Sequence, residues 1–417
     1  MREIIVFIIF FAVAAKAHHP NEGLLKLEDL IHEAMENNPS LKEASSHLTV
    51  VKKESQVLFS LFAPEVSLEG GPFSAKVDDE KSSGTALYGK AEWNLYHGGR
   101  DRSLMTKAGL NSKWAERQIS LSTATVQREV ARVYYEMLFA LESIALKERA
   151  IEMNQEQMKL ARVKKHSGFT SMADVIEFEL REATLVSDLK RLVQEKEDRS
   201  RELSVLVGRK EPVSTLLVKG HLQREPSGLN KTEILHRLDE NNPEILEAMV
   251  NRDLAAQDKD IVRADFMPQV DFEGRYGKLP TEDRISTEND NYSLFLKVKV
   301  PLFSGLSTIR QISAESAKVE RSEMALTRTR LAARAEVENL LAQIGSTLAR
   351  LDLEEKTLAR SEEYYKITLD EYRRGVKNSP DMVTAAERLL EARIRNLEYR
   401  RDYYLTKLRV FAVVGAY

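Results

Sequence analysis

The chain has 417 residues, of which 42% are hydrophobic, 30% are charged and only 7% are aromatic. This balance is typical of long amphipathic helices and unusual for a compact enzyme. The formal net charge is only -3, which provides no basic field for binding nucleic acid. Because there is no cysteine, disulfides, thiolate metal sites and cysteine nucleophiles are excluded.

The N-terminus has the pattern of a secretory signal peptide. Arg2 precedes an apolar run over residues 4–15, and Ala15-Lys16-Ala17 places small residues at the cleavage positions. The run is too short to cross a bilayer comfortably, since a spanning helix needs ~20 apolar residues. We therefore expect residues 1–17 to be removed after Ala17 and the mature protein to be exported.

The mature sequence is an internal duplication. Residues 28–70 align without gaps with residues 232–274, and both copies contain Glu-Asn-Asn-Pro. Further along, Gly168 matches Gly375 and Asp174 matches Asp381 after one short insertion. We expect a first repeat over 18–208, a linker or equatorial segment over 209–229, and a second repeat over 230–417.

Each repeat is predicted to begin with a broken helix. These helices lie near residues 27–61 and 231–265, and each contains an Asn-Pro pair. Proline disfavours helical geometry in the residue before it, so each helix is expected to split in two.

Strands are predicted next, because polar and apolar residues alternate over residues 65–70, 87–95, 269–276 and 293–300. Phe295 departs from the pattern by falling on the polar face. Polar loops are expected over 74–85 and 278–291. Four strands with one charged face fit a membrane barrel, but an open sheet edge is forbidden in lipid. The chain must then oligomerise, and three copies would supply twelve strands.

Long helical rods follow the strands. Residues 101–166 and 306–374 contain no proline and almost no glycine, which predicts two helices of roughly 100 Å each. Apolar residues recur along both at alternating steps of three and four, the spacing of coiled-coil packing. Short glycine turns then lead to returning helices over residues 172–207 and 381–414.

At this point the sequence resembles the outer-membrane efflux proteins of the TolC family. The resemblance rests on the duplicated Asn-Pro element, on a Phe-x-Pro-x-Val entry to a strand, and on Val-Pro-Leu-Phe-Ser-Gly at residues 300–305. It implies a mainly α fold with a small β portion. Long helical hairpins would form a periplasmic α-barrel tunnel, and four strands per protomer would contribute to a trimeric twelve-stranded transmembrane β-barrel. The location implied is the outer membrane, spanning into the periplasm.

The same resemblance implies a function and partners. The chain would be a homotrimeric exit duct, without cofactors, that docks onto a periplasmic adaptor protein and an inner-membrane pump of the RND or ABC type. The hairpin turns would contact the adaptor through Gly168, Phe169, Thr170, Gly375, Val376 and Lys377. The periplasmic gate would comprise Asp381, Asp174, Tyr372 and Lys377.

Other interpretations of these residues remain open. Asp174 and Asp381 each follow a turn, where an acidic residue can simply cap a helix. Tyr372 lies on the apolar stripe, so it can serve packing alone. The histidines show no metal-ligand spacing, and no catalytic motif is present. The rods alone would also suit a soluble periplasmic coiled-coil scaffold, which would have no use for alternating strands. Drug or metal efflux and type I protein secretion use the same kind of duct, and the sequence does not separate them.

Overall fold

The structure is a computed structural model that describes residues 24–77, 80–210, 216–224, 228–279 and 291–415. The predicted signal peptide over 1–17, with its cleavage site at Ala17, lies outside the described residues. The same holds for most of the loop expected over 278–291.

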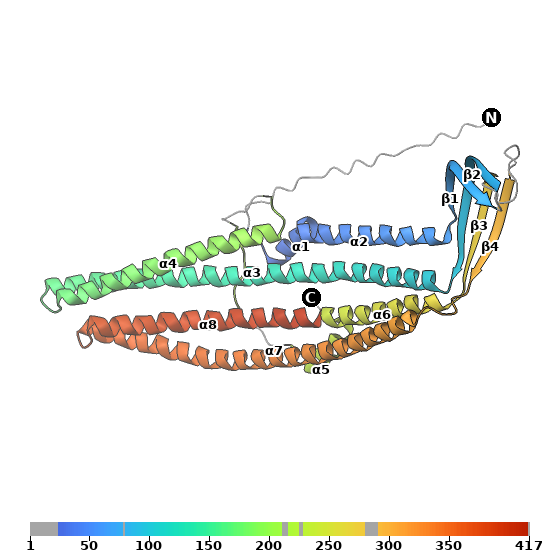
Figure 1. Ribbon diagram of the computed structural model, residues 1–417. Helices are drawn as coiled ribbons and strands as arrows, with labels where there is room; N and C mark the ends of the chain where they lie inside the picture. The colour runs from blue at the N-terminus through green and yellow to red at the C-terminus, as the bar shows by residue number, and fades with distance from the viewer. Residues whose placement is uncertain (1–23, 78–79, 211–215, 225–227, 280–290, 416–417) are drawn as a thin grey trace, which may run out of the picture.

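The same order of elements occurs twice along the chain (Figure 1). In the first half, α1 (Leu27–Asn37), α2 (Pro39–Val57) and η1 (Leu58–Phe62) precede β1 (Glu65–Val77), β2 (Glu80–His97), α3 (Arg100–His166) and α4 (Met172–Leu206). The second half has α5 (Lys231–Asn241), α6 (Pro243–Arg263), η2 (Ala264–Phe266), β3 (Gln269–Lys278), β4 (Asn291–Lys299), α7 (Ser307–Arg374) and α8 (Ser379–Val414). The mainly α fold with a small β portion is confirmed, as are the rods and the two split helices.

The two hairpins, α3 with α4 and α7 with α8, lie side by side and form an elongated body (Figure 1). Their turns lie together at one end, and the sheet lies at the other end. The helix α2 packs along α3, and α6 packs along α7, where both approach the sheet. The fold therefore separates a β end from a pair of helical tips by the length of the rods, about 100 Å for 67 residues.

The duplicated Asn-Pro motif forms a joint between each broken helix and a returning helix. Asn38 caps α2 by accepting from Ser40 N at 2.8 Å, and its Nδ2 donates to the Leu206 carbonyl at 2.7 Å. In the second half, Asn242 accepts from Ile245 N at 2.8 Å and donates to Val413 O at 2.5 Å. Each asparagine thus satisfies one orphan donor and one orphan acceptor at two helix ends.

A glycine makes each joint possible. Gly208 follows α4 with a φ of +80°, and Gly415 follows α8 with a φ of +70°. A β-carbon at either position would collide with the backbone oxygen of Asn37 or Asn241, respectively. The repeated glycine after each returning helix is therefore required both by its left-handed backbone and by the close approach of the other chain segment.

The sheet is antiparallel, with the order β1-β2-β3-β4, so β1 and β4 form its edges. One face carries exposed apolar side chains, whereas the other carries ion pairs such as Lys90–Glu92 at 2.6 Å. Phe295 pairs with Glu273 in the β3–β4 register, which places it on the charged face as predicted. The exposed apolar residues are Val66, Leu68, Leu87, Trp93, Leu95, Tyr276, Tyr292, Leu294, Leu296 and Val298.

One prediction about the sheet is wrong. The polar loop expected over 74–85 belongs largely to strands, since β1 extends to Val77 and β2 starts at Glu80. Gly71, Pro72 and Gly84 have poor strand propensity, yet each has a partner in the β1–β2 ladder. A continuous antiparallel partner supplies the backbone hydrogen bonds here, and this cross-strand pairing overrides the local preference.

The linker over 209–229 packs on the hairpins where the structure describes it. Leu216, Val218 and Leu222 are buried in the main core beside α3 and α8. Val218 forms a parallel bridge with Leu25, and the Tyr134 hydroxyl donates to Lys219 O at 2.6 Å. The segment therefore holds the middle of the molecule together, close to both Asn-Pro joints.

Candidate functional site: the tips of the two hairpins

Each hairpin tip is a tight turn that begins with a left-handed glycine. After α3, Gly168 has a φ of +76°, and Phe169 N donates back to Lys164 O at 2.9 Å. After α7, Gly375 has a φ of +85°, and Val376 N donates to Glu371 O at 2.9 Å. These bonds satisfy the last carbonyls of each rod and reverse the chain within a few residues.

The outermost side chains of both tips are apolar and exposed. Phe169 is 84% exposed and Val376, its counterpart in the second repeat, is 70% exposed. Met172 begins α4 and is 48% exposed. Polar turn residues usually occupy such a position, so repeated apolar residues at the far end of both hairpins are the kind of surface that another protein covers.

Asp174 caps its own helix and also contacts the other hairpin. Its Oδ2 accepts from Thr170 Oγ1 at 2.6 Å, from Ser171 N at 3.0 Å and from Ser171 Oγ at 2.9 Å. Its Oδ1 accepts from Ser379 N, on α8, at 3.4 Å. Partial burial raises the pKa of Asp174, but these hydrogen bonds outweigh burial and hold the pKa at about 2. The residue is ionised at neutral pH and is more than a local cap.

Tyr372 lies buried between the hairpins at the same level. It is 2% exposed, and its hydroxyl lies 3.3 Å from Ser379 Oγ. Lys164 donates to the Tyr372 carbonyl oxygen, and its ammonium lies 4.3 Å from the centre of the tyrosine ring. The ring also makes an edge contact with Phe178 of α4. Tyr372 therefore combines a packing role with a polar contact across the hairpins.

Lys377 and Asp381 form a separate pair within the second hairpin. Lys377 Nζ lies 3.8 Å from Asp381 Oδ2, and Asn378 Oδ1 accepts from Asp381 N at 3.0 Å. Within the described protomer, the structure thus brings Asp174 and Tyr372 together around Ser379. It does not bring Lys377 to Asp174.

Sequence reasoning missed two residues of this contact. Ser379 is fully buried and touches both Asp174 and Tyr372, yet it is the first residue of α8, where serine is common. Lys164 lies in the last turn of α3, where a lysine is expected for the helix dipole alone. The repeat gave no signal for Ser379, because its counterpart in the first repeat is Met172 and few positions around the tips are identical.

The described residues contain no group of three or more histidine or carboxylate side chains that could hold a metal ion. Within the same residues, no helix is long and apolar enough to span a membrane.

The sequence profile of the outer membrane efflux proteins matches the chain twice, over residues 30–208 and again over 234–416. Together the two matches cover most of the chain and coincide with its two halves. The chain belongs to the outer membrane efflux protein family.

Individual members of the family are distant in sequence but similar over most of their length. Protein CyaE of Bordetella pertussis is 22% identical over 407 residues, which cover 94% of this chain and 84% of that protein. Outer membrane protein TolC of Vibrio cholerae is 21% identical over 403 residues, covering 93% and 90%. The crystal structure of VceC from Vibrio cholerae superposes with a TM-score of 0.81 at 18% identity, covering 94% of this chain and 96% of that one.

As an outer membrane efflux protein, the chain is an exit duct located in the outer membrane and reaching into the periplasm. Members of the family are channels, which agrees with the absence of any catalytic motif in the sequence. The same membership leaves no support for a soluble periplasmic scaffold.

Proposed function

We propose that the protein is the gated exit duct of a tripartite efflux or type I secretion system. Three copies would close a twelve-stranded barrel in the outer membrane, continued by a tunnel of helical hairpins in the periplasm. The observation that carries this proposal is the pairing of a four-stranded sheet with two open edges and helical tips at the opposite end of the molecule.

The open edges favour a trimer. Both β1 and β4 have unpaired backbone groups on their outer sides within the protomer, and such groups cannot remain unpaired in lipid. Joining β4 of one copy to β1 of the next continues the antiparallel sheet until it closes. The exposed apolar residues of the sheet would then face lipid, and the ion-paired face would line the pore.

The tips favour an adaptor. Phe169 and Val376 are exposed and apolar, and they stand at repeat-related positions, so three copies would present six similar knobs in a ring. A periplasmic adaptor would bind this ring at Gly168, Phe169, Thr170, Gly375, Val376 and Lys377, and would connect it to an inner-membrane pump of the RND or ABC type. The pump then selects the cargo, and the duct conducts it passively.

The gate would lie just inside the tips. Ser379 N of the second hairpin donates to Asp174 of the first, so separating the hairpins breaks this contact. The contact between the Tyr372 hydroxyl and Ser379 lies within the second hairpin and holds Ser379 in place. Asp381 and Lys377, at the matching position in the second hairpin, would form the corresponding charged part of the entrance.

The trimer can be tested on the purified protein. We expect a detergent-extracted particle from the outer-membrane fraction with three times the mass of the mature chain, measured by light scattering coupled to size exclusion. A protein that stays in solution without detergent as a monomer would contradict the proposed duct.

Adaptor docking can be tested with charge reversals at the tips. Replacing both Lys165 and Lys377 by glutamate is expected to reduce export at least tenfold, because both side chains project at the turns and the substitution changes the local charge by four units. Trimers should still assemble in the membrane. Arg360→Glu is a matched control, since Arg360 is 83% exposed along the rod and far from the tip, and it should export normally. Normal export by the double tip variant would remove the adaptor assignment.

A further inference from the structure

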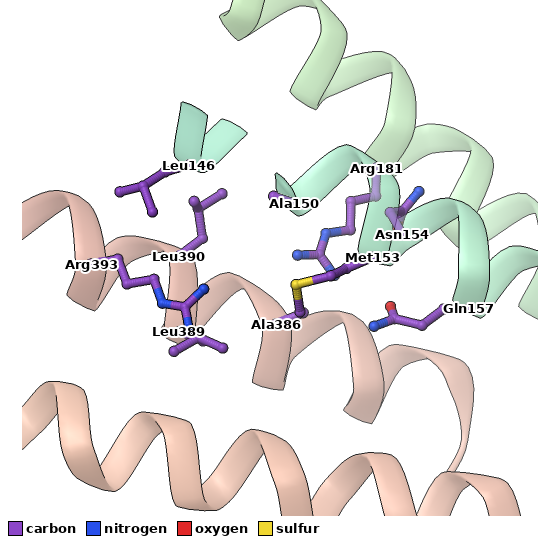
Figure 2. A pocket seen from close by; sticks show the side chains of 10 residues that line it. All are labelled: Leu146, Ala150, Met153, Asn154, Gln157, Arg181, Ala386, Leu389, Leu390 and Arg393. Atoms are coloured by element: carbon purple, nitrogen blue, oxygen red, sulfur yellow. The ribbon is translucent and has the colours of Figure 1, made fainter. Parts of the chain in front are cut away.

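A small cavity with several polar side chains in its lining lies between the hairpins, about two helical turns from the tip contacts. Its lining includes Ala150, Asn154 and Gln157 of α3, Arg181 of α4, and Ala386 and Leu389 of α8. Figure 2 shows the Arg181 side chain extending from α4 past α3 toward α8. Arg181 is only 6% exposed, although arginine is rarely buried without a partner.

The polar atoms facing this space lack partners among the described residues. They are Nε and Nη1 of Arg181, Oδ1 of Asn154 and Oε1 of Gln157. The amide nitrogens of the two neutral side chains are already engaged, because Asn154 donates to Phe178 O at 2.9 Å and Gln157 donates to the Tyr365 hydroxyl at 2.9 Å. These bonds set the orientation of both amides, and rotating the amides would only move the deficit.

The size and chemistry of the cavity select its occupant. Its volume is about 10 Å³, roughly the space that one water molecule needs. The guanidinium would repel a cation, and the two carbonyl oxygens would repel an anion. Water can accept from Arg181 and donate to both Asn154 and Gln157, so it satisfies all three residues.

The charge of Arg181 remains without a carboxylate. Arg393, at the same cavity, is paired with Glu362 at 3.0 Å, whereas no described carboxylate lies within ion-pair distance of Arg181. Burial lowers the pKa of Arg181, and Glu387 and Tyr365 offset this only in part. Its repeat counterpart, Arg388, is exposed and lies 5.6 Å from the Tyr364 ring. The buried charge is thus a property of one hairpin contact and not of the repeat.

A buried charge without a partner weakens the packing around it, because no ion pair offsets the free-energy cost of removing the charge from water. At this level α3 and α4 present the polar side chains of Asn154, Gln157 and Arg181 to α8, whereas the levels on either side are apolar. Moving α8 away would expose Arg181 to water and relieve the cost. The layer therefore favours separation, and the tip contacts around Ser379 oppose it.

We infer that the Arg181 cavity binds one water molecule and forms a hydrated layer at which α8 separates from α3 and α4 when the entrance opens. The second half of this inference rests on the proposed duct, whereas the water site and the weak packing do not. They can be measured on the purified protein without any export assay.

Arg181→Met tests the layer, because methionine keeps most of the stem and removes the charge. We expect the melting temperature of the purified trimer to rise by a few degrees. A high-resolution map of the parent should show one water between Arg181, Asn154 and Gln157. Arg191→Met is the matched control, since Arg191 is on the same helix, 62% exposed and paired with Glu195, and it should leave the melting temperature unchanged.

The role in opening needs a channel measurement. In planar bilayers, Arg181→Met should reduce the open probability at least twofold, while Arg191→Met should not. An unchanged or lower melting temperature for Arg181→Met would contradict the claim that the unpaired charge weakens the packing. A map of the parent without the water would contradict the proposed water site. A stabilised variant with unchanged opening would overturn the gating role alone and leave the duct intact. If Arg181→Met does not assemble, Arg181→Leu replaces it, and failure of both would show that the charge is required and overturn the inference.

Discussion

Replacing Asn38 and Asn242 together by alanine is expected to prevent assembly of a stable protein. Each substitution removes a helix cap and leaves a buried carbonyl, Leu206 O or Val413 O, without its donor. The cap contributes about 1 kcal/mol, and an unsatisfied buried carbonyl costs about 1–3 kcal/mol. Because the two joints share no residues, the effects should add to roughly 6 kcal/mol, a large part of the stability of a typical protein.

The measurement is denaturant unfolding of the single variants, together with trimer yield for the double variant. Asn37→Ala is the control, since Asn37 precedes Asn38 in the same motif but is exposed, and it should change the unfolding free energy by less than about 0.5 kcal/mol. Single variants as stable as this control would show that the joints do not hold the returning helices.

The second large effect is expected at the entrance. Replacing Asp174 by alanine and Tyr372 by phenylalanine removes the bond to Ser379 N and the hydroxyl contact with Ser379 Oγ. The first bond joins the two hairpins, and the second holds Ser379 in place within the second hairpin. Without them the hairpins should separate more readily, and single-channel conductance in planar bilayers should rise severalfold. The matched control is Glu179→Ala. Glu179 pairs with Arg162 at 3.0 Å within one hairpin, so its loss breaks no contact between hairpins.

The pH dependence of the same contact has a defined sign. The pKa of Asp174 is lowered from 3.8 to about 2, so its stabilisation is complete above the unfolded value and is lost as the pH falls from 3.8 through 2. We therefore expect the contact between Asp174 and Ser379 to hold unchanged between pH 7 and pH 5.

The double variant has an outcome that would contradict the proposed gate. If it conducts like the parent, Asp174 and Tyr372 serve only as a cap and a packing residue, and coiled-coil packing alone holds the entrance shut.

Most of the architecture could be predicted from the sequence because its signals are repeated and local. Proline-free segments predict the rods, Asn-Pro splits the first helix of each repeat, and glycine ends each rod. The sequence predicts strands that are too short, because Gly84 and Pro72 locally disfavour strand. Their pairing with residues of the neighbouring strand, which no local pattern shows, makes them part of the sheet.

The contacts between hairpins could not be predicted in the same way. Ser379 meets Asp174 across a distance of 205 residues in sequence, and no local pattern marks a serine for a distant partner. Arg181 did leave a signal. It stands between Val175 and Phe178 on one side and Leu185 on the other, at steps of three and four along the buried face of α4. An arginine within an apolar stripe predicts a buried charge.

The Asn-Pro joints also determine how far the hairpin tips move when a returning helix rotates. Each one grips the end of a returning helix, so the 35 residues of α4 extend about 52 Å from the joint to the tip. A rotation of about 5° at the joint then displaces the tip by roughly 5 Å, more than the reach of any hydrogen bond around Ser379. The hairpin acts as a lever whose pivot is near the middle of the body. Under the proposed function, a partner bound at the tips would act at the far end of this lever, and a small rotation at the joint would open the entrance.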